Sequence, residues 1–323
     1  MQFYRAIGTL MIVFDDIANF RKPPNGCVAT IGKFDGLHLG HQSILDQLKS
    51  QAARVNVPSV VIVIEPHPEE FFEKGSGHRP ARLNTIEEKL ELLEHFGVDF
   101  VYRFNFDDTT SQISAESYIK DILVEGMGLK ALIIGDDFRF GKNRAGDYTL
   151  LRERGDQYDY EVLTTIAYEQ NGHRISSTLV REKLLCGNFN LATQMLGRPY
   201  SISGTVKKGR QLGAGLGFPT CNVEPGANLI PLRGVFACEV RMDARNFKAA
   251  VNIGYRPTVE EQSLVLLEAH ILDFNENVYG EKLEIMFRKK IRDELKFDGI
   301  DALKSQIEND VERVRTYFDA DSI

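Results

Sequence analysis

Short apolar runs alternate with amphipathic helical patterns through the first half of the chain. The apolar runs predict strands at residues 28–31, 60–64, 100–104, 131–134 and 162–166. Between them, apolar residues recur at helical spacing, as they do over residues 44–48 and 86–93. Strands that alternate with helices predict an α/β domain, in which helices cover both faces of a doubly wound parallel sheet. Ligands bind such a sheet beyond the carboxyl ends of its strands.

The second half of the chain carries strand after strand. Strands are predicted at residues 200–206, 235–241, 247–253, 264–272 and 283–287, and the turns between them are rich in Gly, Pro and Asn. This order favours an antiparallel β-barrel. One helix closes the chain, because apolar residues keep helical spacing from Ile300 to Phe318. We therefore expect an α/β domain at residues 1–187 and a β-barrel domain at residues 188–323.

Composition and charge narrow the classes of function. The chain has 323 residues, of which 43% are hydrophobic and 26% charged, as is typical of soluble globular domains. A net charge of −7 argues against nucleic acid or a membrane surface as a general partner, so local basic groups must hold any anionic substrate. Acidic residues close the short N-terminal apolar run, so no signal peptide is expected, and no apolar run approaches membrane length.

The four cysteines are scattered and form no C-x-x-C pair: Cys27, Cys186, Cys221 and Cys238. Reduced thiols and a cytoplasmic location are therefore expected. The sequence does not determine the oligomeric state, and a weak homo-oligomer is compatible with it.

Residues 30–41, the histidine motif, read T-I-G-K-F-D-G-L-H-L-G-H and connect a predicted strand to a predicted helix. His38 and His41 are three residues apart, which places them on one face of the first helical turn. A helix N-terminus favours an anion, and two imidazoles beside it can donate hydrogen bonds to phosphate oxygens. Gly36 and Gly40 let the backbone approach such a ligand. Two alternatives are a junction with two surface histidines and a zinc site, although no third ligand stands at metal spacing nearby.

The full string resembles the H-x-G-H signature of nucleotidyltransferases, and its longer form G-x-F-D-G-x-H-x-G-H resembles the FMN adenylyltransferase half of bacterial FAD synthetases. The resemblance implies a Rossmann-like nucleotidyltransferase domain that attacks the α-phosphate of ATP. It also implies catalytic roles for His38 and His41, and ATP contacts from Gly32, Phe34, Asp35 and Gly40.

Two further segments follow predicted strands. Residues 65–68 read E-P-H-P, which alone could be a proline-rigid turn. Residues 135–141 read G-D-D-F-R-F-G, which alone could be a solvated loop. The second is similar to a family loop that contacts nucleotide or flavin. We interpret His67, Asp137 and Phe138 as flavin-binding, and note that FAD synthetases often have Asp in place of Glu65.

Residues 174–181, the serine motif, read R-I-S-S-T-L-V-R before a helical pattern. Helix N-capping explains one of the hydroxyl residues. Ser176, Ser177 and Thr178 together with Arg181 would form a second anion site, because the Arg181 guanidinium can bind phosphate through two nitrogens. The string resembles the I-S-S-T-x-x-R motif of the same superfamily, which implies that these four residues hold ATP phosphates.

Residues 204–222 form a glycine-rich segment, G-T-V-K-K-G-R-Q-L-G-A-G-L-G-F-P-T-C-N. It matches neither a P-loop nor a dinucleotide fingerprint, and a flexible surface loop is the alternative for its glycines. Thr220 and Asn222 carry oxygens that suit Mg²⁺. The segment resembles the riboflavin kinase motif G-F-P-T-x-N, which binds the magnesium of ATP. That resemblance implies ATP contacts from Gly209, Gly213, Gly217 and Pro219, although many members have Arg in place of Gly215.

The predicted strand 264–272 is apolar apart from Glu268, which shares a face with Leu266, His270 and Leu272. A carboxylate in such a strand is either salt-bridged or functional, and composition leaves both open. The string L-E-A-H-I-L-D-F resembles the riboflavin kinase segment that carries the catalytic base, which implies that role for Glu268. Tyr255 lies in a neighbouring segment similar to the family and is a candidate flavin contact.

The chain is thus interpreted as a bifunctional FAD synthetase with ATP, riboflavin and FMN as substrates and Mg²⁺ as cofactor. One rival is a nucleotidyltransferase for another substrate, fused to a flavin-binding barrel without kinase activity. The other rival is a flavin carrier without enzymatic activity.

Overall fold

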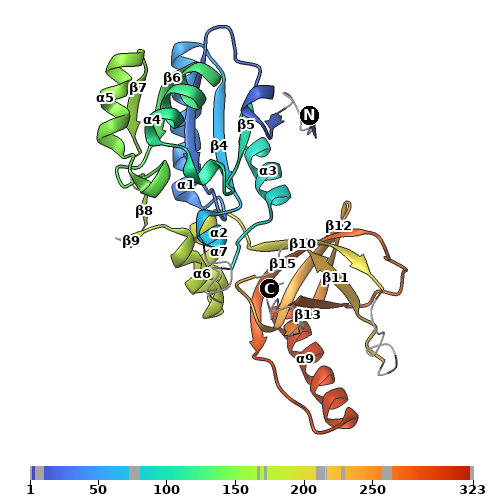
Figure 1. Ribbon diagram of the computed structural model, residues 1–323. Helices are drawn as coiled ribbons and strands as arrows, with labels where there is room; N and C mark the ends of the chain where they lie inside the picture. The colour runs from blue at the N-terminus through green and yellow to red at the C-terminus, as the bar shows by residue number, and fades with distance from the viewer. Residues whose placement is uncertain are drawn as a thin grey trace. The chain divides into compact units, whose positions relative to one another are not determined.

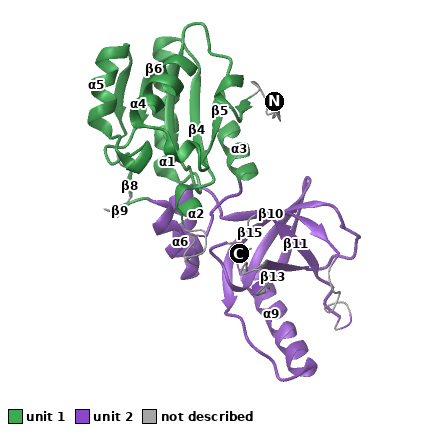
Figure 2. Ribbon diagram, viewed as in Figure 1, with its two compact units in different colours: residues 1–80, 86–175 green, residues 81–85, 176–323 purple. Residues whose placement is uncertain are grey.

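The computed structural model describes residues 2–3, 11–72, 81–165, 168–170, 173–208, 215, 217–226, 230–256 and 264–320 (Figure 1). By its internal contacts the chain divides into two units (Figure 2). Unit 1 comprises residues 1–80 and 86–175, and unit 2 comprises residues 81–85 and 176–323. Within the described part of the chain, every helix is too short or too polar to cross a membrane.

Unit 1 is built on a seven-stranded sheet with the order β1-β2-β5-β4-β3-β6-β7. All neighbours pair in parallel except β1 and β2. The strands are β1 (Gln2–Phe3), β2 (Ile12–Phe14), β3 (Cys27–Gly32), β4 (Ser59–Glu65), β5 (Phe100–Asn105), β6 (Leu129–Ile134) and β7 (Glu161–Thr164). The five predicted strands and their parallel pairing are confirmed, and the pattern did not predict β1 or β2.

Helical segments cover both faces of this sheet (Figure 1). They are η1 (Ile17–Asn19), α1 (Leu39–Val55), α2 (Pro68–Phe72), α3 (Ile86–His95), η2 (Thr110–Gln112), α4 (Ala115–Ser117), η3 (Tyr118–Gly126), η4 (Lys142–Arg144) and α5 (Tyr148–Tyr158). Strand β3 shows why both faces need cover. Ala29 and Ile31 join one buried cluster with residues of η3, whereas Val28 joins the other with Leu45 of α1. A short hairpin, β8 (Glu169–Gln170) and β9 (His173–Arg174), precedes unit 2.

Unit 2 contains a closed antiparallel barrel with the order β10-β11-β14-β13-β12-β15. The strands are β10 (Ser201–Lys207), β11 (Cys221–Pro225), β12 (Gly234–Met242), β13 (Arg245–Arg256), β14 (Leu264–Ile271) and β15 (Lys282–Arg292). Among the described residues, the helices of this unit are α6 (Ser177–Leu185), α7 (Phe189–Leu196) and α9 (Ile300–Ala320). The predicted barrel and closing helix are confirmed, while β11 was missed because its sequence was interpreted as the end of a loop.

Helix α9 packs against the outside of the barrel through one apolar face. Val311, Val314 and Phe318 form a buried cluster with Val235 and Ala237 of β12. A buried ion pair adds to this contact. The Arg292 guanidinium of β15 donates to both oxygens of Asp310 on α9 over 2.6–2.9 Å. The helix is therefore held by both apolar burial and a charged anchor.

Candidate active sites

The turn after β3 is tightly folded. Phe34, Gly36 and Leu37 have positive φ angles of 48°, 84° and 38°. Such angles disfavour residues with a side chain, and burial offsets the strain here, because Phe34 and Leu37 are at most 1% exposed. The Phe34 ring lies 5.1 Å from the ring of His41. Burial of these side chains thus stabilises the turn that places His38 at the start of α1.

His38 is the N-cap of α1 and is 5% exposed. Its Nδ1 accepts a hydrogen bond from the backbone N–H of His41 at 3.3 Å. Because Nδ1 acts as an acceptor, the proton of the neutral imidazole sits on Nε2. The rings of His38 and His41 are stacked, with centroids 3.8 Å apart and planes 17° from parallel. His38 thus caps α1 through Nδ1 and carries its N–H donor on Nε2, at a helix N-terminus.

His41 is held in its neutral form. Burial is the largest cause that keeps the pKa of His41 well below its usual range, and the neighbouring His38 ring and the positive charges of Lys89 and Lys33 lower it further. Its Nδ1 is buried and has no hydrogen-bond partner among the residues that the structure describes. A neutral imidazole with an unpartnered nitrogen is available to a ligand.

Gly40 is required by the stacked histidines. A Cβ at this position would lie 3.1 Å from Cε1 and Nδ1 of His38 and 3.5 Å from the carbonyl oxygen of Ile175. Gly32 is similarly crowded, since its Cβ would lie 3.1 Å from the Phe34 ring. Asp35 lies in the same turn and is 2% exposed. The predicted residues of the histidine motif thus form one compact group at the carboxyl end of β3.

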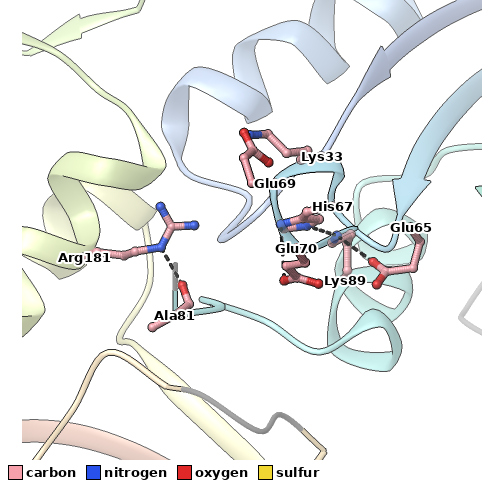
Figure 3. Close-up of polar contacts among 8 residues, drawn as sticks. All are labelled: Lys33, Glu65, His67, Glu69, Glu70, Ala81, Lys89 and Arg181. Atoms are coloured by element: carbon pink, nitrogen blue, oxygen red, sulfur yellow. Dashed lines mark hydrogen bonds and ion pairs between the residues drawn. The ribbon is translucent and has the colours of Figure 1, made fainter. Parts of the chain in front are cut away.

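The turn after β4 contains a buried polar group (Figure 3). His67 is 2% exposed, and its Nε2 lies 3.4 Å from the Nζ of Lys89, which comes from α3. The same Nζ lies 3.6 Å from Oε2 of Glu65. On its other side, the Nδ1 of His67 lies 3.8 Å from Glu70. His67 was predicted from the sequence as a site residue, but Lys89 was not, because a lysine at helical spacing carries no local sign of burial.

An aromatic cluster lies beside this turn. The rings of Phe71, Phe72 and Phe106 meet edge to face at centroid distances of 5.2–5.7 Å. Phe72 is 68% exposed, which is unusual for so large an apolar side chain. On the loop after β6, Phe138 stacks on Phe140 at 5.6 Å, and Asp137 is exposed. Phe71 and Phe72 were not predicted as site residues, although two adjacent phenylalanines shortly after the E-P-H-P turn are visible in the sequence.

Residues 176–181 of the serine motif belong to unit 2 and lead into α6. Ser176 is the N-cap, and its hydroxyl accepts the N–H of Leu179 at 3.2 Å. Thr178 is exposed and Ser177 is half-buried. The Nε of Arg181 donates to the carbonyl oxygen of Ala81 at 2.5 Å, as Figure 3 shows. Helix N-capping thus explains Ser176, as was expected from the sequence for one of the hydroxyl residues.

Glu268 lies between two asparagines on neighbouring barrel strands. It pairs in register with Asn222 of β11 on one side and with Asn252 of β13 on the other. It also lines a cavity of about 250 Å³ together with Thr220, His270 and a largely apolar wall: Phe218, Val235, Ala250, Leu295, Phe297, Leu303, Ile307 and Val311. No described residue forms an ion pair with Glu268, so the salt-bridge alternative finds no support in the described part of the barrel.

Thr220 lines a second cavity of about 200 Å³ as well. Its other walls come from the start of β11, from the end of β14 and from the following loop, including Asn275, Asn277 and Tyr279. Pro219 lines this cavity, and its carbonyl oxygen bonds the Nδ1 of His270 at 2.8 Å. Thr220 therefore stands at the wall shared by two cavities, with Glu268 in only one of them.

The remaining predicted residues of unit 2 are more dispersed. Gly209 and Gly213 lie outside the described residues, and Gly217 has a positive φ of 91°. The hydroxyl of Tyr255 donates to the carbonyl oxygen of Ile230 at 2.5 Å, and Tyr255 lines neither cavity. Asn252 was not predicted as a site residue, because only strand pairing places it beside Glu268.

The oxygen donors at and next to Thr220 fit a magnesium ion. Thr220 offers a hydroxyl at the wall of both cavities, and Asn222, two residues further along the chain, offers an amide oxygen. Glu268 lines one of the cavities and is paired in register with Asn222. Mg²⁺ takes few protein ligands when phosphate and water complete its shell. In the described part of the chain, no three His, Cys, Asp or Glu side chains gather as a metal site.

Comparison with known proteins matches each half of the chain to a protein family. Residues 20–179 match the FAD synthetase family model, and residues 196–318 match the riboflavin kinase family model. The chain is 41% identical to the bifunctional riboflavin kinase/FMN adenylyltransferase of Escherichia coli (strain K12), over 92% of this chain and 94% of that protein. It is 39% identical to the protein of the same name from Haemophilus influenzae, over 94% and 97%.

A crystal structure described as a macrolide-efflux protein from Streptococcus pneumoniae shares the fold with a TM-score of 0.79. That protein is 27% identical, over 94% of this chain and 98% of its own length. The two family models, together with relatives of about 40% identity over nearly the full length, show that the chain belongs to the bifunctional riboflavin kinase/FMN adenylyltransferase family.

Proposed function

We propose that this chain converts riboflavin to FMN and then FMN to FAD, with ATP as the co-substrate of both reactions. The kinase reaction belongs to residues 188–323 and the adenylyltransferase reaction to residues 1–187. The observation that carries the proposal is the position of Thr220 at the wall shared by two cavities, one of which contains Glu268. That arrangement suits transfer of a phosphoryl group from a nucleotide in one cavity to an acceptor in the other.

In the kinase reaction, riboflavin occupies the cavity with the apolar wall, since its ring system is flat and largely apolar. Glu268 accepts the proton of the 5′-hydroxyl, and the resulting oxygen attacks the γ-phosphorus of ATP, so that FMN and ADP form. Asn222 and Asn252 flank Glu268 in register on the two neighbouring strands. When bound, Mg²⁺ offsets the charge of the ATP phosphates, and Thr220 and Asn222 would hold it.

The nucleotide of the kinase reaction occupies the second cavity. The wall formed by Asn275, Asn277 and Tyr279 provides amide groups and an aromatic ring that suit a nucleobase. The glycine-rich segment then contacts the phosphates through Gly209, Gly213, Gly217 and Pro219. The Pro219–Thr220 turn lies between both ligands and sets the distance between them.

In the adenylyltransferase reaction, a phosphate oxygen of FMN attacks the α-phosphorus of ATP, and pyrophosphate leaves. His38 donates its Nε2–H to an oxygen of the α-phosphate, and neutral His41 stands beside it at the helix N-terminus. Ser176, Ser177, Thr178 and Arg181 bind the outgoing phosphates. No general base is required, because the FMN phosphate is already ionised.

The remaining contacts of this reaction are assigned by position. Gly32, Phe34, Asp35 and Gly40 form the ATP pocket around the histidine motif. His67, Asp137 and Phe138 contact the flavin, and the exposed ring of Phe72 offers it a stacking surface. Tyr255 remains a flavin candidate of the barrel. The substrates are small molecules, and we place the protein in the cytoplasm without nucleic-acid or membrane partners.

Incubation of the purified protein with riboflavin, ATP and Mg²⁺, followed by chromatographic separation of flavins, tests the proposal. FAD as the product supports both activities. FMN as the only product would leave just the kinase, and FAD from supplied FMN alone would leave just the adenylyltransferase. Unchanged riboflavin and FMN would support a flavin carrier instead.

A further inference from the structure

Lys89 is a lysine without solvent exposure. It lies in the first turn of α3 in unit 1, and its side chain is 0% exposed. Lysine is almost never fully buried unless it is paired, because removal of an ammonium from water is costly. The ammonium is buried at the edge of the sheet formed by the carboxyl ends of its strands, where the histidine motif also lies. A buried charge in that place requires a reason beyond packing.

Its described partners both belong to the turn after β4. The Nζ of Lys89 lies 3.4 Å from Nε2 of His67 and 3.6 Å from Oε2 of Glu65 (Figure 3). Glu65 is the last residue of β4, and His67 directly precedes α2. One ammonium therefore connects α3 to the two polar residues of the turn.

The ammonium also determines which nitrogen of His67 carries the proton. An ammonium group has three donors and no acceptor, so Nε2 of His67 must accept. The proton of the neutral ring then lies on Nδ1, which faces Glu70 at 3.8 Å. His38 has the opposite tautomer, with its proton on Nε2, because its Nδ1 accepts a backbone N–H.

We propose that Lys89 is a positioning residue for FMN adenylylation, which holds His67 in one tautomer and one orientation. This inference rests on the proposed function of unit 1. Electrostatics supports it, since Lys89 is one of the charges that keep the pKa of His41 low. A fixed cation near the reacting phosphates stabilises charge without reorganisation during the reaction.

Replacement of Lys89 by methionine tests the activity, because methionine is similar in length and carries no charge. In Lys89→Met, the kcat/KM for FAD formation from FMN should fall about 10- to 100-fold, as expected for the loss of a supporting contact. Riboflavin phosphorylation by the same molecules should not change. Lys120→Met is the matched control, because Lys120 is 56% exposed on η3, and it should leave both activities intact.

Nitrogen-15 NMR of histidine-labelled protein measures the tautomer of His67, which would not change if Lys89 had only a structural role. The chain has seven histidines, and loss of one signal in His67→Asn assigns His67. Wild-type protein should show His67 protonated on Nδ1, and Lys89→Met should shift it toward Nε2. Lys89→Arg, which keeps the charge and the donors, should retain the Nδ1 tautomer and more adenylylation activity than Lys89→Met.

Two results would overturn the inference. One is full FAD formation by Lys89→Met, and the other is an unchanged His67 tautomer in a folded Lys89→Met protein. The tautomer measurement needs no activity. A wild-type protein that makes no FAD would thus refute the proposed function, while the NMR result would still decide the role of Lys89.

Discussion

Glu268 and Asn222 face each other in register across the antiparallel strands β14 and β11. Directly opposed residues on one face of such a pair have Cβ atoms about 4.5–5.5 Å apart. The pairing places the amide of Asn222 next to the carboxylate of Glu268, which lines the cavity where Thr220 also lies. Their 46-residue separation in sequence is bridged by the barrel and not by any local motif.

Glu268→Gln should abolish FMN formation and spare FAD formation from supplied FMN. Glutamine keeps the shape and loses the basic oxygen, and loss of a general base typically lowers the rate about 10²- to 10⁴-fold. Separate assays with riboflavin and with FMN measure the two reactions. Equal loss of both activities would instead indicate damage to the whole chain.

His38→Ala should show the reverse pattern, with FMN accumulating from riboflavin. The substitution removes the Nε2–H donor and the N-cap of α1, whose loss alone costs about 0.5–2 kcal/mol of stability. His38→Asn is the control, because asparagine is a good N-cap without an imidazole. If His38→Asn made FAD at the wild-type rate, His38 would serve only as a cap.

His270→Leu should slow riboflavin phosphorylation. The imidazole donates to the Pro219 carbonyl at 2.8 Å and so supports the turn that carries Thr220. Loss of this hydrogen bond should cost about 0.5–1.5 kcal/mol, which corresponds to a few-fold to about tenfold loss in kcat/KM. His270→Asn places an amide N–H near the position of Nδ1 and should recover part of the activity. Equal rates for both variants would contradict the assignment.

The thiols should differ in reactivity toward iodoacetamide. Burial raises the pKa of Cys27 to about 12 and that of Cys221 to about 11, and it also raises the pKa of Cys238. A raised thiol pKa reduces the reactive thiolate at pH 8, and the thiolate appears only as the pH approaches the raised value. Mass spectrometry at pH 8 should find Cys186, which is exposed, alkylated first. Early labelling of Cys27 in folded protein would disagree with this order.

Asp310→Ala should destabilise unit 2. Asp310 is 4% exposed, and its removal leaves the Arg292 guanidinium without its carboxylate partner, which typically costs about 3–5 kcal/mol. Thermal unfolding followed by circular dichroism measures the effect. Asp301→Ala, at an exposed position of the same helix, is the control and should change stability by at most about 0.5 kcal/mol.

Sequence periodicity was sufficient for the two architectures, because each strand and helix reports its buried face locally. It missed β11, since Asn222 and its neighbours have few apolar residues and gain their strand structure from pairing with β10 and β14. Periodicity also did not distinguish between a salt-bridged and a functional role for Glu268. The choice depends on whether a cation lies opposite, and that is a property of other strands.

The sequence by itself determined the alternation of elements, the motifs at strand ends and the family to which they point, because these are properties of neighbouring residues. Only the tertiary structure decided that Lys89 is buried against His67, that Asn252 flanks Glu268, and that Thr220 borders two cavities. Each of these contacts joins residues far apart in the chain. Their geometry follows from strand pairing and helix packing, which no local pattern records.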